Sequence, residues 1–540
     1  MECMPDPDNP VFPAQAYHQE RGVSSESALA IDVVHRYLLC SNIATSPTFG
    51  RCAFSTSLYP QASNNLSMVH VFTLPTTSHL SFQTFLTSST HPSLPKSAST
   101  ARHALLLALK IHNRLPRGEQ QDAHLPTVLT ALNDYLPYLF AISHGLSGKP
   151  NGANTGIGEE IEITLRTEVE SEWRATLSAT TSPFKNIGPL PQQRQKNGRV
   201  RGRGLDFEIA FTLTSLGYVL NGLARRVLLK TLYNARTPAA EQRTAAIQTA
   251  TRYLLQASAI HTFLESSPSF GSIATATISS GGGNSAVPDL DSATQSALSS
   301  LALAEATLLA VLKDDVYVST CIQTRNPYDR DWMIGAPEIP KVRALLFARL
   351  CVRAAEYAEQ AAAGFGSVRT EGKRHSAVDN DLIKYTTVLG RIARAKACRF
   401  FGVDAELAGK VGEAIAWLRA ARGALTSRNG SYLVAGDECT TATGGSSSKG
   451  LSGGLSKLKQ GWTERRYEMK MDKDAGGKDH HVKKGGLDPG DSAGRDEEVH
   501  VIEMLEAKWV KMNNTVSYPL YLPLLNGVVC PLFSYGMSHR

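Results

Sequence analysis

The feature that most constrains this 540-residue chain is a series of amphipathic segments between residues 98 and 422. In each segment apolar side chains recur every three or four residues, the spacing of one face of an α-helix. Nine long segments follow this pattern: 98–115, 126–142, 158–177, 205–233, 239–264, 292–313, 340–363, 381–401 and 407–422. We therefore predict a mainly α-helical protein, built as an extended helical stack rather than a compact bundle.

The N-terminal part has a different composition. Residues 1–67 are rich in Ser, Pro and Asn without a sustained period, so we expect a disordered extension or an artefact of the gene model. From residue 68 the sequence VHVFTLPTTSHLSF follows, whose β-branched and aromatic residues predict a small strand element. The helical domain is predicted over 68–425, with a flexible Ser/Gly linker at 265–288.

The C-terminal part also lacks long apolar periods. Residues 426–498 form a low-complexity tail with mixed charge, for which we expect a solvated segment. A short amphipathic helix is predicted within 499–514. Residues 515–540 form a tail with three prolines and no charged residue between 516 and 537, which we expect to be irregular because a membrane-spanning helix tolerates one proline more readily than three.

Charge and cysteine usage exclude several classes of protein. The net charge is +7, from 56 basic and 49 acidic residues, far below the basic excess of a dedicated nucleic-acid binder. The eight cysteines form no C-x-x-C pair, which argues against a zinc or redox motif and fits a reducing compartment. Cys351 and Cys398 lie in apolar helical patterns and are expected in the core.

No catalytic or cofactor motif is present. The chain has no phosphate-binding loop, dinucleotide fingerprint, H-E-x-x-H or G-x-S-x-G. We therefore assign no catalytic, cofactor-binding or metal-binding residues and predict that the protein is not an enzyme. Glu305 is the one acidic residue within an otherwise apolar helix, where we expect it to link helices through hydrogen bonds.

A basic run between residues 194 and 203 carries five cations beside three glycines. We expect a surface loop before the next helix. The alternative is contact with an anionic membrane or an acidic partner. Nucleic acid is not expected as a partner, because no aromatic residues lie between the cations.

The predicted helix 340–363 has three distinct faces at 100° per residue. The polar face consists of Arg349, Arg353 and Glu356. The core face consists of Phe347, Cys351, Ala354 and Ala358. The shoulder between these faces consists of Leu346, Leu350 and Tyr357. Large apolar residues beside arginines suit a groove that accepts an amphipathic helix. They equally suit packing against a neighbouring helix, and the pattern leaves both readings open.

Long stretches of the sequence resemble a known family. LALAEATLLAVLKDD (301–315) and DWMIGAPEIPKVRALLFARLCVRAAEYAEQA (331–361) resemble the Bro-type domain of Alix-like, ESCRT-associated proteins, and most closely its fungal pH-response regulators. Further similar stretches lie at 73–82, 124–141, 241–264, 381–422 and 454–462. The resemblance implies an elongated, boomerang-shaped helical domain with a superhelical, TPR-like core and a small N-terminal strand element.

The resemblance also implies a function. Such proteins act as non-catalytic adaptors in fungal ambient-pH signalling. They bind the C-terminal helix of the core ESCRT-III subunit, connect it to a plasma-membrane pH-sensing complex and support proteolytic activation of the transcription factor PacC at alkaline pH. We accordingly expect a cytoplasmic protein recruited to the plasma membrane or endosomal membrane. The alternative is a peripheral or tail-anchored membrane-trafficking protein whose main contact is lipid.

Alignment to the family places the partner-binding patch on two adjacent helices. It falls near Leu309, Ala310 and Val311 on the first helix, and at Leu346 and Leu350 on the second. The two last residues are also the shoulder residues of the helical wheel. We therefore expect Leu309, Val311, Leu346 and Leu350 to bind the ESCRT-III helix.

Overall fold

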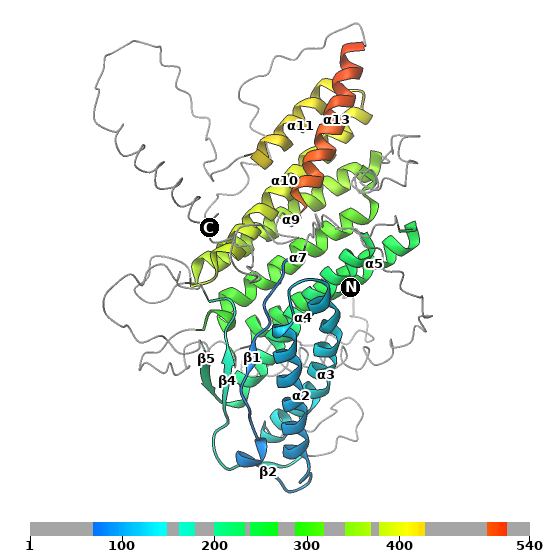
Figure 1. The fold of residues 1–540 in the computed structure, drawn as a ribbon. Coiled ribbons are helices and arrows are strands. Elements are labelled where there is room, and N and C mark those ends of the chain that lie inside the picture. The colour runs from blue at the N-terminus through cyan, green and yellow to red at the C-terminus, as the bar shows by residue number, and fades with distance from the viewer. Residues whose placement is uncertain are drawn as a thin grey trace, which may run out of the picture. The chain divides into compact units, whose positions relative to one another are not determined.

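The computed structural model describes residue 270 and eight stretches of the chain: 69–147, 161–178, 199–232, 238–267, 287–317, 341–368, 377–426 and 494–515 (Figure 1). The chain divides into two compact units, and these residues all belong to the first, which comprises Met1–Thr426 and Pro489–Leu520. The predicted segments 1–67 and 515–540 lie almost wholly outside the described residues, as do most of 265–288 and 426–498.

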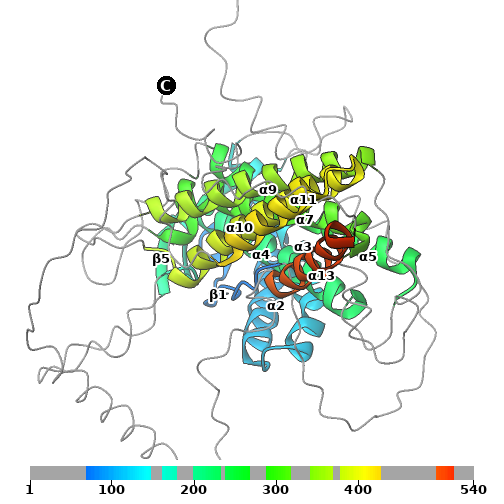
Figure 2. The same cartoon turned by 90° about the horizontal axis from the view of Figure 1, so that it is seen from above.

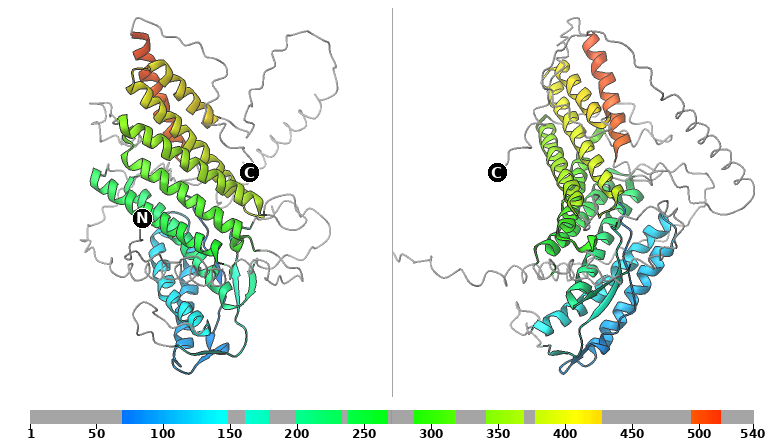
Figure 3. Two further views of the ribbon diagram at one scale, coloured as in Figure 1. Left: turned by 180° about the vertical axis from the view of Figure 1, so that it is seen from behind. Right: turned by 90° about the vertical axis from the view of Figure 1, so that its left-hand side faces the viewer.

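Seven long helices follow one another in the stack. Each packs against the next in chain order, as Figures 1 and 3 show. They are α4 (Leu205–Leu232), α5 (Ala240–Ser266), α7 (Ser292–Asp314), α9 (Lys341–Ser367), α10 (Asn380–Leu407), α11 (Val411–Thr426) and α13 (Arg495–Thr515). This order confirms the predicted mainly helical stack.

Two further helices form an antiparallel hairpin before the stack. They are α2 (Leu94–Arg114) and α3 (Glu119–Ser147), and α3 packs on α4. The turn between them contains Gly118, whose φ of 114° favours glycine. Pro126 and Pro137, inside α3, did not end the helix as proline often does.

The apolar composition of α4 and α7 follows from burial. Both helices are long and apolar enough to cross a membrane, but most of each is enclosed by neighbouring helices. The side chain of Asp291 caps α7 by accepting a hydrogen bond from the Ala293 N–H over 2.9 Å. Burial among the neighbouring helices therefore accounts for the apolar composition of both.

The predicted helix at 158–177 is wrong, because the described part of this segment forms strands β3 (Ile163–Leu165) and β4 (Glu170–Arg174). Val169, Ser171 and Trp173 are buried while the residues between them are more exposed. This alternation has the period of two that defines a strand with one buried face. The apolar residues that predicted the helix are four positions apart, and this spacing fits the period of a strand as well as that of a helix.

The described part of the basic run, residues 199–203, is a strand rather than the expected loop. β5 (Arg199–Arg203) pairs antiparallel with β4, and β1 (Thr76–Thr77) pairs with the other edge of β4, so the sheet order is β1-β4-β5. A second sheet joins β2 (Leu86–Ser88) to β3. β1 and β2 confirm the predicted N-terminal strand element.

Carboxylates on β4 neutralise part of this basic strand. Arg203 pairs with Glu170 over 3.0 Å, and Arg201 pairs with Glu172. The register also places Arg199 opposite Arg174, so one like-charged pair remains at the end of the ladder. The cations therefore have a structural role as cross-strand partners.

The C-terminal helix α13 packs against α11 and α10, far from it in sequence. It includes the predicted helix 499–514 and begins four residues earlier, at Arg495. Figure 2 shows α10 beside both α9 and α11. Val501, Leu505 and Trp509 are buried, so one face of α13 completes the core at this end of the stack.

Candidate partner-binding face on α7 and α9

Helix α9 presents the three faces that its sequence predicts. Phe347, Cys351 and Ala354 are buried in the core. Leu346 is 52% exposed, the largest exposure of any large apolar side chain among the described residues, and Leu350 is partly exposed. The shoulder prediction is therefore confirmed for these two leucines: neighbouring helices leave their side chains accessible.

Helix α7 presents only Ala310 of the three residues near which the family alignment placed the patch, and not the two expected to bind. Leu309 and Val311 are 0% and 1% exposed, so both side chains belong to the core. Ala310, between them, is exposed. A partner on this surface would touch Ala310, while Leu309 and Val311 could act only as packing beneath it.

The two helices run antiparallel. At one end Arg343 of α9 approaches Asp314 of α7 at 4.0 Å, and at the other end Gly364 packs directly against Ala297. Ala310 is one turn before Asp314 and Leu346 is about one turn after Arg343. Ala310 and Leu346 therefore lie at the same level of the helix pair.

Arginines flank the exposed leucines. Arg349 is exposed, and Arg353 pairs with Glu356 over 2.7 Å while its guanidinium lies 4.4 Å from the ring centroid of Tyr357. The latter distance is typical of a cation–π contact. We name the surface of Ala310, Leu346, Leu350 and Arg349 the α7–α9 face; its apolar centre and basic rim suit an amphipathic helix with acidic residues.

On the same helix α7, Glu305 links three parts of the chain. Its carboxylate accepts hydrogen bonds from the backbone N–H of His70 at 2.9 Å and from the Tyr385 hydroxyl at 2.8 Å. These bonds confirm that Glu305 is a structural link. Complete burial raises its pKa to about 8, so the carboxyl is mostly protonated at neutral pH.

A buried tetrad of charges fixes α13, and we name it the α13 clamp. Arg399 contacts Asp315 at 2.5 Å and Glu498 at 2.6 Å, and Lys396 contacts Glu498 at 2.8 Å. All four side chains are nearly or fully buried, and the cations hold the pKa of Glu498 below its usual value although burial opposes them. Two positive and two negative charges balance within the clamp.

Another buried carboxylate, Glu208 of α4, connects the sheet to the hairpin. It accepts hydrogen bonds from Arg102 at 2.8 Å, from the Tyr135 hydroxyl at 2.9 Å and from the Trp173 indole at 2.7 Å. Arg102 also donates to Ser78 and Thr77. The sequence analysis missed both charged clusters, since their members are far apart along the chain.

Neither the α13 clamp nor the cluster around Glu208 is arranged as a catalytic site. Their polar groups are saturated by one another and are closed to solvent, as expected of structural ion pairs. Within the described ranges, no group of three or more His, Cys, Asp or Glu side chains could hold a metal ion. Cys351 and Cys398 are free thiols in the core, as predicted.

Comparison with known proteins identifies the family. The model of the BRO1-like domain matches residues 173–474. The chain is 59% identical over 458 residues to the "pH-response regulator protein palC" of Emericella nidulans, an alignment that covers 84% of each chain. This similarity confirms the resemblance that the sequence stretches indicated.

The matches to solved structures are more distant. An ALIX BRO1–CHMP4C complex has 15% identity and a TM-score of 0.40, covering 66% of this chain and 79% of that chain. A Bro1 domain described in the context of endosomal targeting has 13% identity and a TM-score of 0.39, covering 83% and 86%. The palC match and the matched domain together show that the chain belongs to the BRO1-like domain family, among the pH-response regulators of the PalC type.

Proposed function

We propose that this protein is a non-catalytic adaptor that binds the C-terminal helix of the core ESCRT-III subunit through the α7–α9 face. Through this contact it would connect a plasma-membrane pH-sensing complex to ESCRT-III and support proteolytic activation of PacC at alkaline pH. It would act in the cytoplasm and be recruited to the plasma membrane or endosomal membrane. The partner and the pathway come from the family resemblance.

The observation that carries the site is the exposure of Leu346 beside the partly exposed Leu350. Folding removes only part of the surface of a half-exposed leucine from water, so the burial of this side chain contributes little to stability. Its remaining apolar surface is available for a partner. The residues lie one helical turn apart, the spacing at which a second helix can pack alongside. Arg349 adds a cation that favours an acidic partner residue at the rim.

Peptide binding tests this function. A fluorescent peptide of the ESCRT-III C-terminal helix is titrated with the full chain and with the variants Leu346→Asp and Leu350→Asp. We expect each variant to weaken binding by about tenfold or more, because loss of a central apolar contact commonly costs over 1 kcal/mol. Leu255→Asp is the matched control, since Leu255 is 48% exposed on α5, outside this face.

The outcomes separate the function from the site. Binding that both leucine variants retain would exclude the α7–α9 face and keep the adaptor. A full chain that does not bind the peptide would contradict the adaptor itself. We rank lipid contact through the 194–203 cations lower, because Glu170 and Glu172 already neutralise two of the arginines there.

A further inference from the structure

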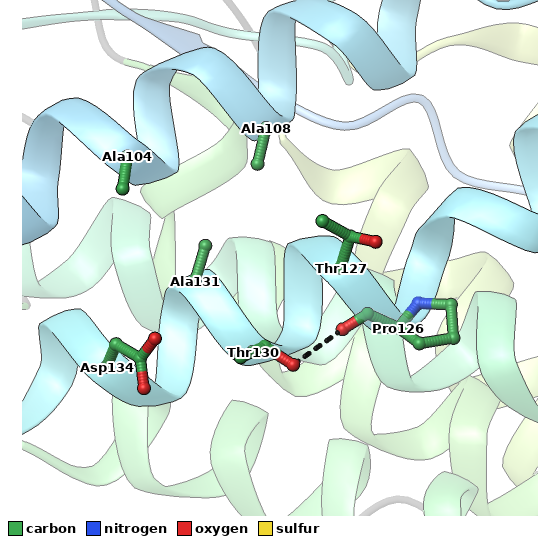
Figure 4. Close-up of a pocket in the computed structure, with 7 residues that line it drawn as sticks. All are labelled: Ala104, Ala108, Pro126, Thr127, Thr130, Ala131 and Asp134. Atoms are coloured by element: carbon green, nitrogen blue, oxygen red, sulfur yellow. Dashed lines mark hydrogen bonds between the residues drawn. The ribbon is translucent and has the colours of Figure 1, made fainter.

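The α2–α3 hairpin carries a groove that the proposed function does not use. Ala104 and Ala108 of α2 face Thr127, Thr130 and Ala131 of α3 across an open groove of about 450 Å³. Figure 4 shows Asp134 at the end of the groove next to Ala104, and Pro126 at the opposite end. Short side chains therefore line a surface depression that is large enough to receive side chains from outside.

The polar atoms of the groove do not oppose apolar contact. The Thr130 hydroxyl donates to the Pro126 carbonyl over 3.1 Å, as the dashed line in Figure 4 marks. Its hydrogen-bonding demand is met within α3. The lining is otherwise mainly alanine, threonine and proline, so an apolar side chain could enter the groove without leaving a donor unpaired.

Large apolar side chains lie on the same stripe of α2. Ala104, Leu107, Ala108 and Ile111 follow the i, i+3, i+4, i+7 spacing of one helix face. Leu107 and Ile111 are 47% and 48% exposed, whereas the nearby Leu106 and Leu109 are buried. The stripe thus carries both projecting residues and the depression that could accept them.

Opposite charges lie at the two ends of this stripe. Asp134 is exposed beside Ala104, and Arg114 is exposed at the turn end of α2, about 15 Å along the helix axis at 1.5 Å per residue. Lys110 adds a second cation near Arg114, while Glu119 in the first turn of α3 offsets one of them. Asp134, Arg114 and Lys110 make no ion pair among the described residues.

We infer that the α2–α3 groove is a self-association surface that binds the same groove of a second copy of this chain across a two-fold axis. An isologous interface needs one patch that complements itself. Here Leu107 and Ile111 of each copy would enter the other's groove, as knobs enter holes. In the antiparallel arrangement Asp134 of one copy faces Arg114 of the other at both ends.

Sedimentation velocity of the full chain over about a hundredfold range of concentration tests this inference. We expect a monomer–dimer equilibrium whose dissociation constant rises about tenfold or more in Leu107→Glu, because the variant places a charge in the apolar groove. Leu255→Glu, equally exposed on α5, is the matched control and should associate like the wild type. Circular dichroism melts verify that the variants are folded.

Charge reversal at Asp134 and Arg114 tests the antiparallel arrangement and leaves the alanine and threonine lining of the groove unchanged. Asp134→Arg and Arg114→Asp should each weaken the dimer about two- to fivefold, and the double variant should recover most of this loss. Both side chains are exposed, so folding is not at risk. A full chain that is monomeric at every concentration, a dimer that Leu107→Glu does not weaken, or a double variant without recovery would overturn the inference.

Discussion

Arg399 of α10 and Glu498 of α13 form a fully buried ion pair at 2.6 Å, although 99 positions separate them in the chain. Asp315, at the end of α7, and Lys396 complete the α13 clamp. Because neither charge of the pair is accessible to water, each depends on the other for its solvation. The clamp therefore attaches the last described helix to the stack by electrostatics as well as by apolar packing.

Removal of one member of the clamp should destabilise the protein strongly. Glu498→Ala leaves Arg399 and Lys396 with only Asp315 as a counter-ion, and breaking a buried pair in this way costs about 3–5 kcal/mol. We expect a lower melting temperature and faster hydrogen exchange in α13. Arg422→Gln, which removes a half-exposed partner of Glu506, should cost less than about 1 kcal/mol. Equal effects of the two variants would contradict this account.

Glu305 should make the stability of the fold sensitive to alkaline pH. Its folded pKa of about 8 lies above the ordinary value of 4.5, so the folded state binds the proton more tightly than the unfolded state. The stabilisation is complete below about pH 4.5 and is lost as the pH rises to about 8.

The comparison that isolates Glu305 uses Glu305→Gln, which retains an acceptor for His70 and Tyr385 but cannot ionise. Urea unfolding midpoints are measured from about pH 6 to about pH 9. The stability of the variant should increase relative to that of the wild type as the pH rises. A difference that stays constant over this range would mean that the carboxyl does not titrate there.

A methyl group at position 202 should disrupt the β4–β5 sheet. A Cβ on Gly202 would lie 2.1 Å from the Phe207 ring, and Phe207 is buried at the start of α4. We expect Gly202→Ala to cost about 1–3 kcal/mol through overpacking. Gly366→Ala is the control, because no atom lies within 4 Å of its Cβ and alanine favours the helix. Chemical denaturation measures both, and an unaffected Gly202→Ala would show that the ring can move aside.

The helices were predictable because each buries one face, and the apolar residues of that face repeat along the sequence. In α9 the wheel placed Phe347 and Cys351 inside and Leu346 on the shoulder between the core and polar faces; the first two are buried and Leu346 is 52% exposed. In the segment at 158–177 the same reasoning failed, because Leu165, Val169 and Trp173 are four residues apart and an even spacing also fits a strand. The burial of Ser171 between two apolar residues decides for the strand.

The site was less predictable than the fold. On α7 a shift of one residue turns the side chain by about 100°, which separates the exposed Ala310 from the buried Leu309 and Val311. The ion pairs could not be predicted from spacing, since Arg399 finds its carboxylates 84 and 99 positions away. Tertiary packing alone brings such residues together.

The α13 clamp also defines what a usable fragment of this protein must contain. A fragment ending at Thr426 would retain Arg399 and Lys396 but lose Glu498, and its cut surface would expose the side of α11 and α10 that α13 covers. Such a fragment should be prone to aggregate on expression, since an uncovered apolar surface with an uncompensated charge favours misassembly. A fragment that keeps the fold must therefore extend past Glu498, although the continuous series of helices in the sequence ends near Thr426.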